Sequence, residues 1–426
     1  MPTFKHAEQL LQFIWLHKYY NKALLTSLQG EPITVIYPGK WNTNNEGPDF
    51  SEAQIKIGNT VWHGNVEVHI KTSQWLQHKH QNNKHYDNVI LHVVYENDMQ
   101  NDNLNLTTAE LQHIIPHNLL NNYESLMQQT NTLPCAAQIA NVPDITKLLW
   151  QEKMVVERLM QKTEKILVAL KDTKEHWEAI FWHALARNFG LKVNADACEL
   201  MAKTIDVNIL YKHKNNFLQL EALLMGQAGL LHNNFKDGYA TMLYNEHKYL
   251  AAKWKLTPIV KPVSFLRMRP ASFPTIRLSQ LAQLIHKSHF LLSAIKEHKE
   301  MATIKKLLKV TANDYWNTHF TFDVENTPSE KILGSTTIDI ICINTIIPFV
   351  YAWGKYYKQP LLQQKAIGWL EQLRPETNNI TKIFEGFKLK ATTAAQSQGQ
   401  IYLYNNYCLP KKCLQCSIGN SIVKRV

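Results

Sequence analysis

Apolar and polar side chains alternate most clearly between residues 66 and 71, which read V-E-V-H-I-K. Successive side chains of a strand point to opposite faces of a sheet, so this alternation predicts a strand with one apolar and one polar face. Glu67, His69 and Lys71 lie on the polar face, and the three aliphatic residues of the segment lie on the other. The apolar face requires burial, while the polar face presents an acid, an imidazole and an amine in a row.

The segments around this strand predict a helix, three strands, a short helix and a further strand, in that order. Gly58 and Asn59 are a tight-turn signal that joins the strand to the one before it. Ser73 is the predicted N-cap of the short helix. The predicted elements cover residues 4–28 (helix), 33–37, 53–57 and 66–71 (strands), 73–80 (short helix) and 89–95 (strand).

From Pro143 onward the apolar residues recur with the spacing of amphipathic helices. The segment 265–277 interrupts this pattern with two prolines and three arginines, which predict an extended connector. Before Pro143, a weak strand is predicted at 104–111 and a short helix at 119–127. The helices predicted after it cover residues 144–169, 174–189, 195–204, 217–230, 238–253, 278–295, 302–310, 336–357 and 361–373.

These patterns predict an α+β protein. An α/β core with a mixed sheet is expected in residues 1–140, and a mainly α-helical domain in residues 141–400. A C-terminal segment that contains three cysteines, residues 401–426, follows. A chain of 426 residues with 45% hydrophobic and 19% charged residues suits a globular protein of two or three domains.

The formal net charge of +11 favours an anionic partner, and nucleic acid is the partner that we expect. Many basic proteins bind no polyanion, which is the alternative. The first twenty residues lack the pattern of a secretion signal, and the apolar run at 338–353 is predicted to be too short and too interrupted to span a bilayer. Six cysteines are too few for a disulfide framework. We therefore expect a cytoplasmic protein without a membrane span, and the sequence does not fix its oligomeric state.

Asp49 precedes the strand at 53–57, and the predicted hairpin places it near the Glu67 end of the polar row. Two such carboxylates can hold a hard divalent cation through oxygen atoms. The cation lowers the pKa of a bound water and stabilises charge on a phosphoryl oxygen. We therefore interpret Asp49 and Glu67 as candidate ligands of Mg²⁺ or Mn²⁺, with a hairpin that has a solvated polar edge as the alternative.

The element order, the Pro48-Asp49 pair and the acid-x-basic run on the following strand resemble the PD-(D/E)xK nuclease superfamily. This resemblance implies a nuclease-like fold, metal-binding acids at Asp49 and Glu67, and hydrolysis of phosphodiester bonds in DNA or RNA. The position of the family's lysine holds His69, and Lys71 lies two residues further along the same face. The resemblance therefore implies that either His69 or Lys71 positions the attacking water.

A second candidate site is a group of histidines. His78 and His80, with Glu67 and His69, have a spacing that can ligate a transition metal, and zinc suits imidazole. This pattern supports a zinc- or manganese-dependent hydrolase of a small substrate as an alternative function. His92 lies within a predicted buried strand, where a hydrogen-bonded core histidine is the alternative to a ligand. The six histidines of this region are His63, His69, His78, His80, His85 and His92.

Cys408, Cys413 and Cys416 have the spacing C-x4-C-x2-C. A C-x2-C pair brings two sulfurs to one metal, so the tail predicts zinc or an iron–sulfur cluster, with reduced thiols as the alternative. Either centre needs a fourth ligand. The candidates for it are Cys135, Cys198, Cys342 or a histidine.

Two further features of the helical part carry weaker predictions. The planar guanidinium groups of Arg267, Arg269 and Arg277 suit a phosphate backbone, and ordinary ion pairs with neighbouring helices are the alternative. Gly226 and Gly229 predict close packing of helices and not a phosphate-binding loop, since no G-K-[ST] follows.

Strings along almost the whole chain look like those of an uncharacterised bacterial family of unknown function. They include G-P-D-F, V-E-V-H, G-Q-A-G-L-L, R-P-A-S-F-P-T-I-R and the cysteine tail. This resemblance implies no activity. The first hypothesis is therefore a metal-dependent nuclease, and the second is a non-catalytic nucleic-acid-binding or scaffold protein with a nuclease-like fold.

Overall fold

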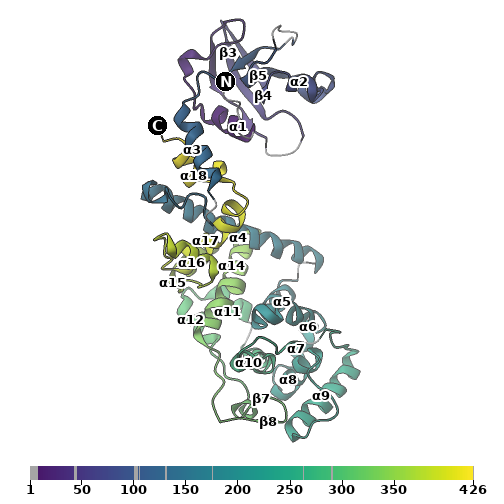
Figure 1. Ribbon diagram of the computed structural model, residues 1–426. Helices are drawn as coiled ribbons and strands as arrows, with labels where there is room; N and C mark the ends of the chain where they lie inside the picture. Colours follow the sequence, from purple (N-terminus) through teal and green to yellow (C-terminus); the bar gives the residue numbers. More distant parts are fainter. Residues whose placement is uncertain are drawn as a thin grey trace. The chain divides into compact units, whose positions relative to one another are not determined.

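The computed structural model describes residues 8–42, 46–99, 104, 106–129, 132–174, 176–261, 263–288 and 291–425. The chain forms two compact units (Figure 1). Unit 1 combines residues 1–150 with residues 404–426, and unit 2 comprises residues 151–403. The C-terminal segment thus belongs to the same unit as the N-terminal strands. The predicted α+β class is confirmed, because unit 1 contains a mixed sheet and unit 2 is mostly helical.

The core of unit 1 is a six-stranded mixed sheet with the order β1-β3-β4-β5-β6, to which β2 adds by pairing with β3. The pairs β1–β3 and β3–β4 are antiparallel, whereas β4–β5 and β5–β6 are parallel. A crossover that contains α2 therefore connects β4 to β5. The strands are Ile33–Tyr37 (β1), Lys40–Trp41 (β2), Phe50–Ile57 (β3), Thr60–Lys71 (β4), Val89–Glu96 (β5) and Thr108–Glu110 (β6).

The predicted hairpin between β3 and β4 is confirmed. Its turn contains Gly58, whose φ of 57° is a conformation that glycine adopts without strain. Further along the hairpin, Phe50 pairs with Val66, so the residue before β3 lies beside the middle of β4. Both faces of β4 are covered there, since Val66 and Val68 are fully buried on one face, and Glu67 and His69 on the other are 6% and 1% exposed. A hairpin with a solvated polar edge therefore does not describe this part of the sheet.

Helix α1 (Glu8–His17) packs against β4 with an almost entirely apolar face. The predicted helix over 4–28 is too long, because α1 ends at His17 and Lys18 adopts a left-handed backbone with a φ of 55°. A short 3₁₀ turn, η1 (Lys22–Leu24), follows. Residues 4–7 of the prediction lie outside the described residues.

Short helices and turns complete unit 1. Ser73 stands at the N-cap position of α2 as predicted, but its hydroxyl donates to Asp98 at 2.7 Å and makes no cap hydrogen bond. Helices α3 and α18 lie side by side, which joins the C-terminal segment to the N-terminal part of the unit (Figure 1). The elements are α2 (Gln74–Gln77), η2 (His80–Asn82), η3 (Lys84–Tyr86), α3 (His117–Gln128), η4 (Ile139–Asn141), η8 (Tyr404–Cys408), η9 (Cys413–Gln415) and α18 (Ser417–Val423).

Unit 2 consists of helices around one apolar core, with a two-stranded hairpin of β7 (His319–Thr321) and β8 (Val324–Glu325). Helix α4 (Asp144–Asp172) begins in unit 1 and continues into unit 2. The other helical elements are α5 (Trp177–Phe189), α6 (Leu191–Lys203), α7 (Val207–His213), α8 (Phe217–Gln227), α9 (Gly238–Trp254), η5 (Pro270–Ser272), α10 (Pro274–Lys287), α11 (Leu291–Glu297), α12 (Met301–Leu307), η6 (Asp314–Asn317), α13 (Ser335–Ile341), η7 (Cys342–Ile346), α14 (Ile347–Tyr356), α15 (Pro360–Gln372), α16 (Asn379–Gly386) and α17 (Ala394–Leu403).

The segment predicted as an extended connector at 265–277 is partly helical. Pro274 starts α10, where a proline at the first helical position is favourable, so Arg277 lies on a helix. The Arg277 side chain is buried and donates to Gln280, Ser272 and Thr337. Arg277 is therefore a core residue of unit 2 and is not available to a phosphate, whereas Arg267 and Arg269 are exposed.

One helix, Ser335–Tyr356, is long and apolar enough by length and composition to cross a membrane. This helix runs through α13, a π-helical turn and α14, and it is longer than the apolar run at 338–353. The prediction that the segment is too short to span a bilayer is therefore wrong as regards its length. Within the structure, 83% of its apolar window is buried. The helix packs against α5 and α15 in the core of unit 2.

The predicted close helix packing at Gly226 is confirmed. A Cβ at this position of α8 would lie 2.1 Å from the His247 ring of α9. Gly226→Ala should therefore lower the free energy of unfolding by about 1–3 kcal/mol, as overpacking of a core does. Gly368→Ala is the matched control, because a Cβ on Gly368 in α15 would meet no atom within 4 Å. This control should gain roughly 0.5–1 kcal/mol, and equal effects of both substitutions in denaturant unfolding would contradict the packing argument.

Candidate metal centre

The antiparallel pairing of β3 and β4 brings Asp49 and Glu67 together, as predicted. The backbone N–H of Asp49 donates to Glu67 Oε2 at 3.0 Å. The Asp49 carboxylate accepts from the backbone N–H of Val68 at 3.0 Å and from the side-chain amide of Gln12 at 2.7 Å. Asp49 is thus fixed between α1 and β4, and Glu67 keeps its second oxygen for other partners.

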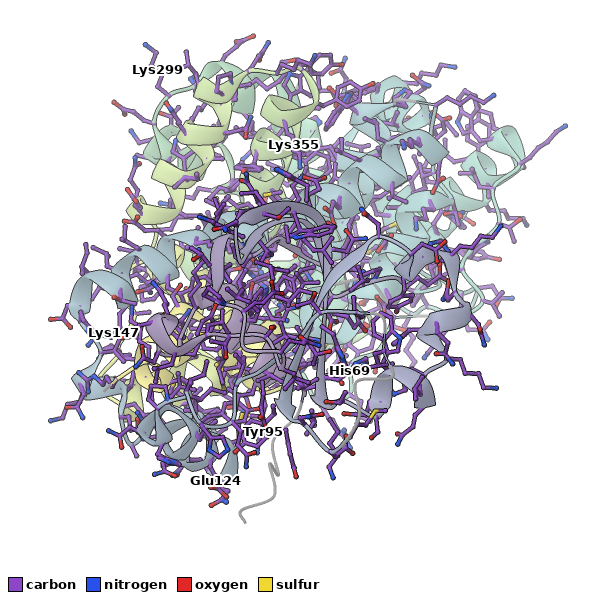
Figure 2. All side chains as sticks on the ribbon, turned by 90° about the horizontal axis from the view of Figure 1, so that it is seen from above. His69, Tyr95, Glu124, Lys147, Lys299 and Lys355 are labelled. Carbon is purple, nitrogen blue, oxygen red and sulfur yellow. The ribbon has the colours of Figure 1, made fainter. Side chains whose placement is uncertain are left out.

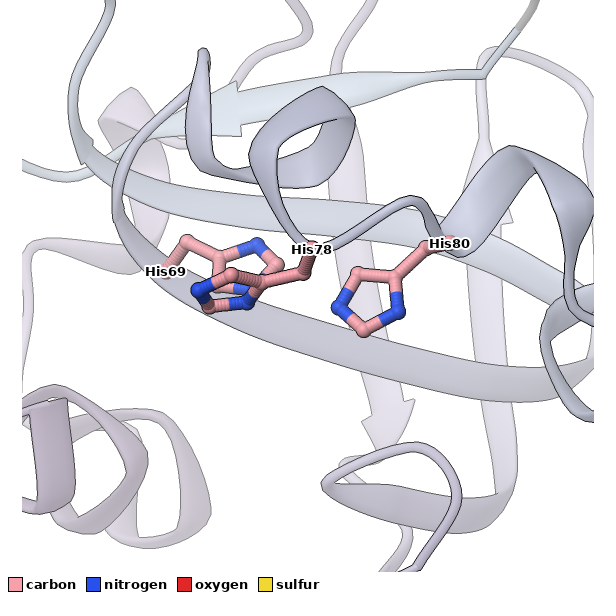
Figure 3. Close-up of side chains that lie close together, drawn as sticks. All are labelled: His69, His78 and His80. Atoms are coloured by element: carbon pink, nitrogen blue, oxygen red, sulfur yellow. The ribbon is translucent and has the colours of Figure 1, made fainter.

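The second oxygen of Glu67 faces two imidazoles. Glu67 Oε1 lies 3.5 Å from His69 Nε2 and 3.4 Å from His80 Nε2. His78 Nδ1 lies 3.2 Å from the same nitrogen of His69. The ligand atoms of the three histidines all lie within 4.8 Å of one another, and Figure 3 shows the rings gathered in one place. The structure therefore brings together Glu67, His69, His78 and His80, the set that the sequence offers as a transition-metal site.

His92 supports His69 from the neighbouring strand. The parallel register of β4 and β5 pairs Glu67 with His92, and His92 Nε2 lies 2.9 Å from His69 Nδ1. With the proton on His69 Nδ1, the hydrogen bond leaves His69 Nε2 as the nitrogen with a free lone pair. His92 is fully buried and orients His69, as a partner behind a metal-binding histidine does. In Figure 2 the labels His69 and Tyr95 mark the two neighbouring strands, β4 and β5, and His92 belongs to β5.

The turn after β4 delivers His78 and His80 to the site. Lys79, between them, adopts a left-handed backbone with a φ of 58°, which reverses the chain after α2. Trp75 packs edge-on against the His80 ring, and Tyr86 stacks on it with 3.8 Å between the centroids. His80 is therefore fixed and buried, while His78 is exposed. The site has a buried wall and one side open to solvent at His78.

Burial and crowding raise the pKa values of the acids. The pKa of Glu67 rises to about 9, chiefly because its carboxylate is removed from water and then because of the charge on Asp49. The pKa of Asp49 rises to about 7, through burial first and then through the charge on Glu8. Buried carboxylates without a compensating charge cost free energy, which a bound cation would offset.

The histidines, in contrast, are held neutral. Burial lowers the pKa of His69 to about 2, and charge on the neighbouring histidines adds to the effect. Burial likewise lowers the pKa of His92 to about 3 and that of His80 to about 4. Neutral imidazole is the form that binds a metal ion. At neutral pH His69 and His80 therefore present unprotonated ring nitrogens to Glu67.

The distances suit a transition-metal ion. Bonds of about 2.0–2.1 Å from zinc to nitrogen or oxygen, in tetrahedral geometry, put neighbouring ligand atoms roughly 3.3–3.4 Å apart. The separations around Glu67 and His69 are 3.5, 3.4 and 3.2 Å. His80 Nε2 is buried without a hydrogen-bond partner, because its approach to Glu67 lacks hydrogen-bond geometry. These observations fit a divalent ion shared by imidazole and carboxylate.

Other predicted residues lie outside this cluster. Lys71 is at the exposed end of β4, where its charge acts on Asp98. Of the two residues implied to position the water, His69 is the one that the structure brings to Glu67. Arg267 and Arg269 belong to unit 2, and the cysteine tail forms a separate group.

Two residues of α1 were missed by the sequence analysis. Gln12 donates to Asp49 at 2.7 Å and to Glu8 at 3.4 Å, and the charge on Glu8 acts on both Asp49 and Glu67. Their signal was available, since an acid and an amide four residues apart lie on one face of a helix that is otherwise apolar there.

Comparison with known proteins gives a family and no activity. A family model described as a protein of unknown function (DUF2851) matches residues 8–379. No curated protein and no solved structure matches the chain. The predicted membership of an uncharacterised family is confirmed over most of the chain, and the likeness to the nuclease superfamily stays a prediction.

Proposed function

We propose that this chain, which belongs to the DUF2851 family, is a metal-dependent hydrolase that cleaves phosphodiester bonds of nucleic acid. The observation that carries the proposal is the gathering of three histidines in unit 1, two of which, His69 and His80, place Nε2 within 3.5 Å of Glu67 Oε1. Glu67, His69 and His80 would hold Zn²⁺ or Mn²⁺ from the buried side. His78 would stand at the open side, where water and substrate enter.

The roles of the side chains follow from their surroundings. The ion would lower the pKa of a water and stabilise charge on a phosphoryl oxygen. With the proton on His69 Nδ1, the bond to His92 would leave the Nε2 lone pair of His69 to hold the ion. His78 is exposed and close to His69, so it is placed to accept a proton from the attacking water.

The charge around the site supports a nucleic-acid substrate. The chain carries a net charge of +11, and the segment that delivers the histidines contains Lys79 and Lys84, both exposed. A substrate phosphate at the ion would leave the adjacent phosphates near these lysines. Binding through phosphates releases counterions and weakens steeply with salt.

The test is cleavage of labelled single- and double-stranded DNA and RNA with Zn²⁺, Mn²⁺ or Mg²⁺. We expect cleavage with Zn²⁺ or Mn²⁺ that a chelator abolishes. Lys79→Gln with Lys84→Gln should weaken binding and lower the slope of log affinity against log salt by roughly two, about one for each lost phosphate contact. Lys306→Gln with Lys309→Gln removes the same charge from exposed sites of unit 2 and is the matched control. A bound metal without cleavage of any nucleic acid would contradict the substrate class and favour a small substrate or a non-catalytic role.

The raised pKa values of Asp49 and Glu67 support a second candidate, which is Mg²⁺ held by the two acids as the nuclease resemblance implies. His80→Ala separates the candidates. Loss of activity with every metal favours the histidine centre, because His80 would be a ligand in that centre and not in the pair of acids. Full activity of His80→Ala with Mg²⁺ favours the pair of acids.

A further inference from the structure

Four cysteines from distant parts of the sequence belong to unit 1. Cys135 lies between α3 and η4, and the other three lie in the C-terminal segment from η8 to the start of α18. The packing of α18 against α3 brings the two segments together. The remaining cysteines, Cys198 and Cys342, are buried in the core of unit 2. Cys135 is therefore the cysteine available as the fourth partner of the tail.

The four thiols lie close enough to influence one another. After burial, the charges on Cys416 and Cys413 raise the pKa of the Cys135 thiol to about 12. The charge on Cys135 in turn helps to raise the pKa of the Cys408 thiol, again after burial. All six cysteines of the chain are free thiols, so no disulfide accounts for the cluster. None of the four is exposed.

Burial raises the pKa of the Cys416 thiol, and hydrogen bonds to its sulfur oppose part of this rise. The backbone N–H groups of Ile418 and Gly419 and the indole of Trp150 donate hydrogen bonds to its sulfur. Such bonds stabilise the deprotonated sulfur, which is the form that binds metals. A Cβ on Gly419 would lie 2.2 Å from the carbonyl oxygen of Cys413, so the turn of the C-x2-C pair packs directly on the start of α18.

We propose that Cys135, Cys408, Cys413 and Cys416 bind one metal centre through four thiolates. The centre would tie the chain after α3 to the C-terminal segment, which the long excursion through unit 2 separates in sequence. One hydrogen bond makes the same connection nearby, from Lys411 Nζ to the carbonyl oxygen of Met127 at 3.1 Å. The proposal is independent of the function of the histidine centre.

A zinc ion and an iron–sulfur cluster share this ligand chemistry. Around one zinc ion, sulfurs at about 2.3 Å stand roughly 3.8 Å apart, whereas a cluster takes its cysteines on different irons and spreads them. The two are told apart by composition, since only the cluster contains iron and acid-labile sulfide.

The experiment measures iron, acid-labile sulfide and zinc per chain in the full-length protein purified without oxygen, with its visible absorption. We expect either iron with sulfide or zinc without sulfide in the wild type, and at least a tenfold loss of these elements in Cys135→Ala and in Cys413→Ala. Cys342→Ala, which changes a buried cysteine of unit 2, is the matched control and should retain them. His80→Ala, measured alongside, accounts for zinc bound at the histidine centre.

A second measurement covers variants that fail to fold. In the wild type, the four thiols should resist alkylation until the metal is removed, whereas Cys198 should stay protected throughout because it is buried in unit 2. Iron with sulfide would identify the four-thiolate centre as a cluster, and zinc without sulfide would identify it as a single-ion site. A metal content unchanged by Cys135→Ala, or a wild type whose four thiols react at once and hold no metal, would overturn the proposal.

Discussion

Glu67→Gln should reduce metal-dependent cleavage by at least about 100-fold and weaken metal binding at the histidine centre. Glutamine has the size of glutamate and can still accept the hydrogen bond from the Asp49 backbone, which is 3.0 Å long. It removes the negative charge from the atom that lies 3.4 and 3.5 Å from the two buried imidazoles. The fold should therefore remain while the ion loses its anionic ligand.

Calorimetric titration with Zn²⁺ or Mn²⁺ and cleavage assays on the same preparations measure both effects. Glu52→Gln is the matched control, because Glu52 lies on the adjacent strand β3 and makes an exposed ion pair with Lys40. This control should leave metal affinity and cleavage unchanged, since an exposed pair of this kind contributes little. Wild-type affinity and cleavage in Glu67→Gln would show that the carboxylate is structural and that the proposed centre is wrong.

Period-two alternation was sufficient to predict that Glu67 and His69 share a face, and the turn at Gly58 was sufficient to place Asp49 beside them. Both are local rules of strands and hairpins. The same alternation put Lys71 in the row, but burial falls from His69 to Lys71 because the end of β4 leaves the covered part of the sheet. Pattern alone does not say where the cover of a strand ends.

The convergence of His78 and His80 on Glu67 depends on contacts that no local pattern encodes. Lys79 has no preference for the left-handed backbone that reverses the chain, and the aromatic packing around His80 comes from the rest of the crossover. The partnership of Cys135 with the tail likewise requires α18 to pack on α3. Sequence predicted the candidate residues of both centres, and tertiary structure decided which of them meet.

Without metal, the region around β4 should lose stability as the pH rises from 7 to 9, and Glu67→Gln should remove this loss. The pKa of Glu67 is about 9 in the folded chain against an ordinary value of 4.5. Between these values the folded chain holds a proton that the unfolded chain has released, so the free energy of unfolding falls as the pH rises. The slope reaches at most about 1.4 kcal/mol per pH unit for one proton.

The other groups near the site whose pKa values differ from the ordinary ones do not make stability fall between pH 7 and 9. The pKa of Asp49 rises to about 7, so its contribution falls mainly below that pH. The buried histidines have pKa values lowered from 6.5, and their contribution is lost as the pH falls below 6.5. In unit 2, burial lowers the pKa of Lys162 to about 7, which makes stability rise with pH between 7 and 10. The difference between the wild type and Glu67→Gln therefore isolates Glu67.

Hydrogen exchange of peptides from β4 and β5, measured with a chelator present, reads the local free energy of opening at this site. The wild-type value should decrease from pH 7 to 9 relative to Glu67→Gln, and the two curves should converge below pH 4.5, where both side chains are uncharged. Saturating Zn²⁺ or Mn²⁺ should flatten the wild-type curve, because the ion stabilises the carboxylate and displaces its proton. Parallel curves without metal would mean that Glu67 is already ionised while 6% exposed, with a cationic partner that the structure does not provide. The proton that stabilises the empty site is thus the one that metal binding must release.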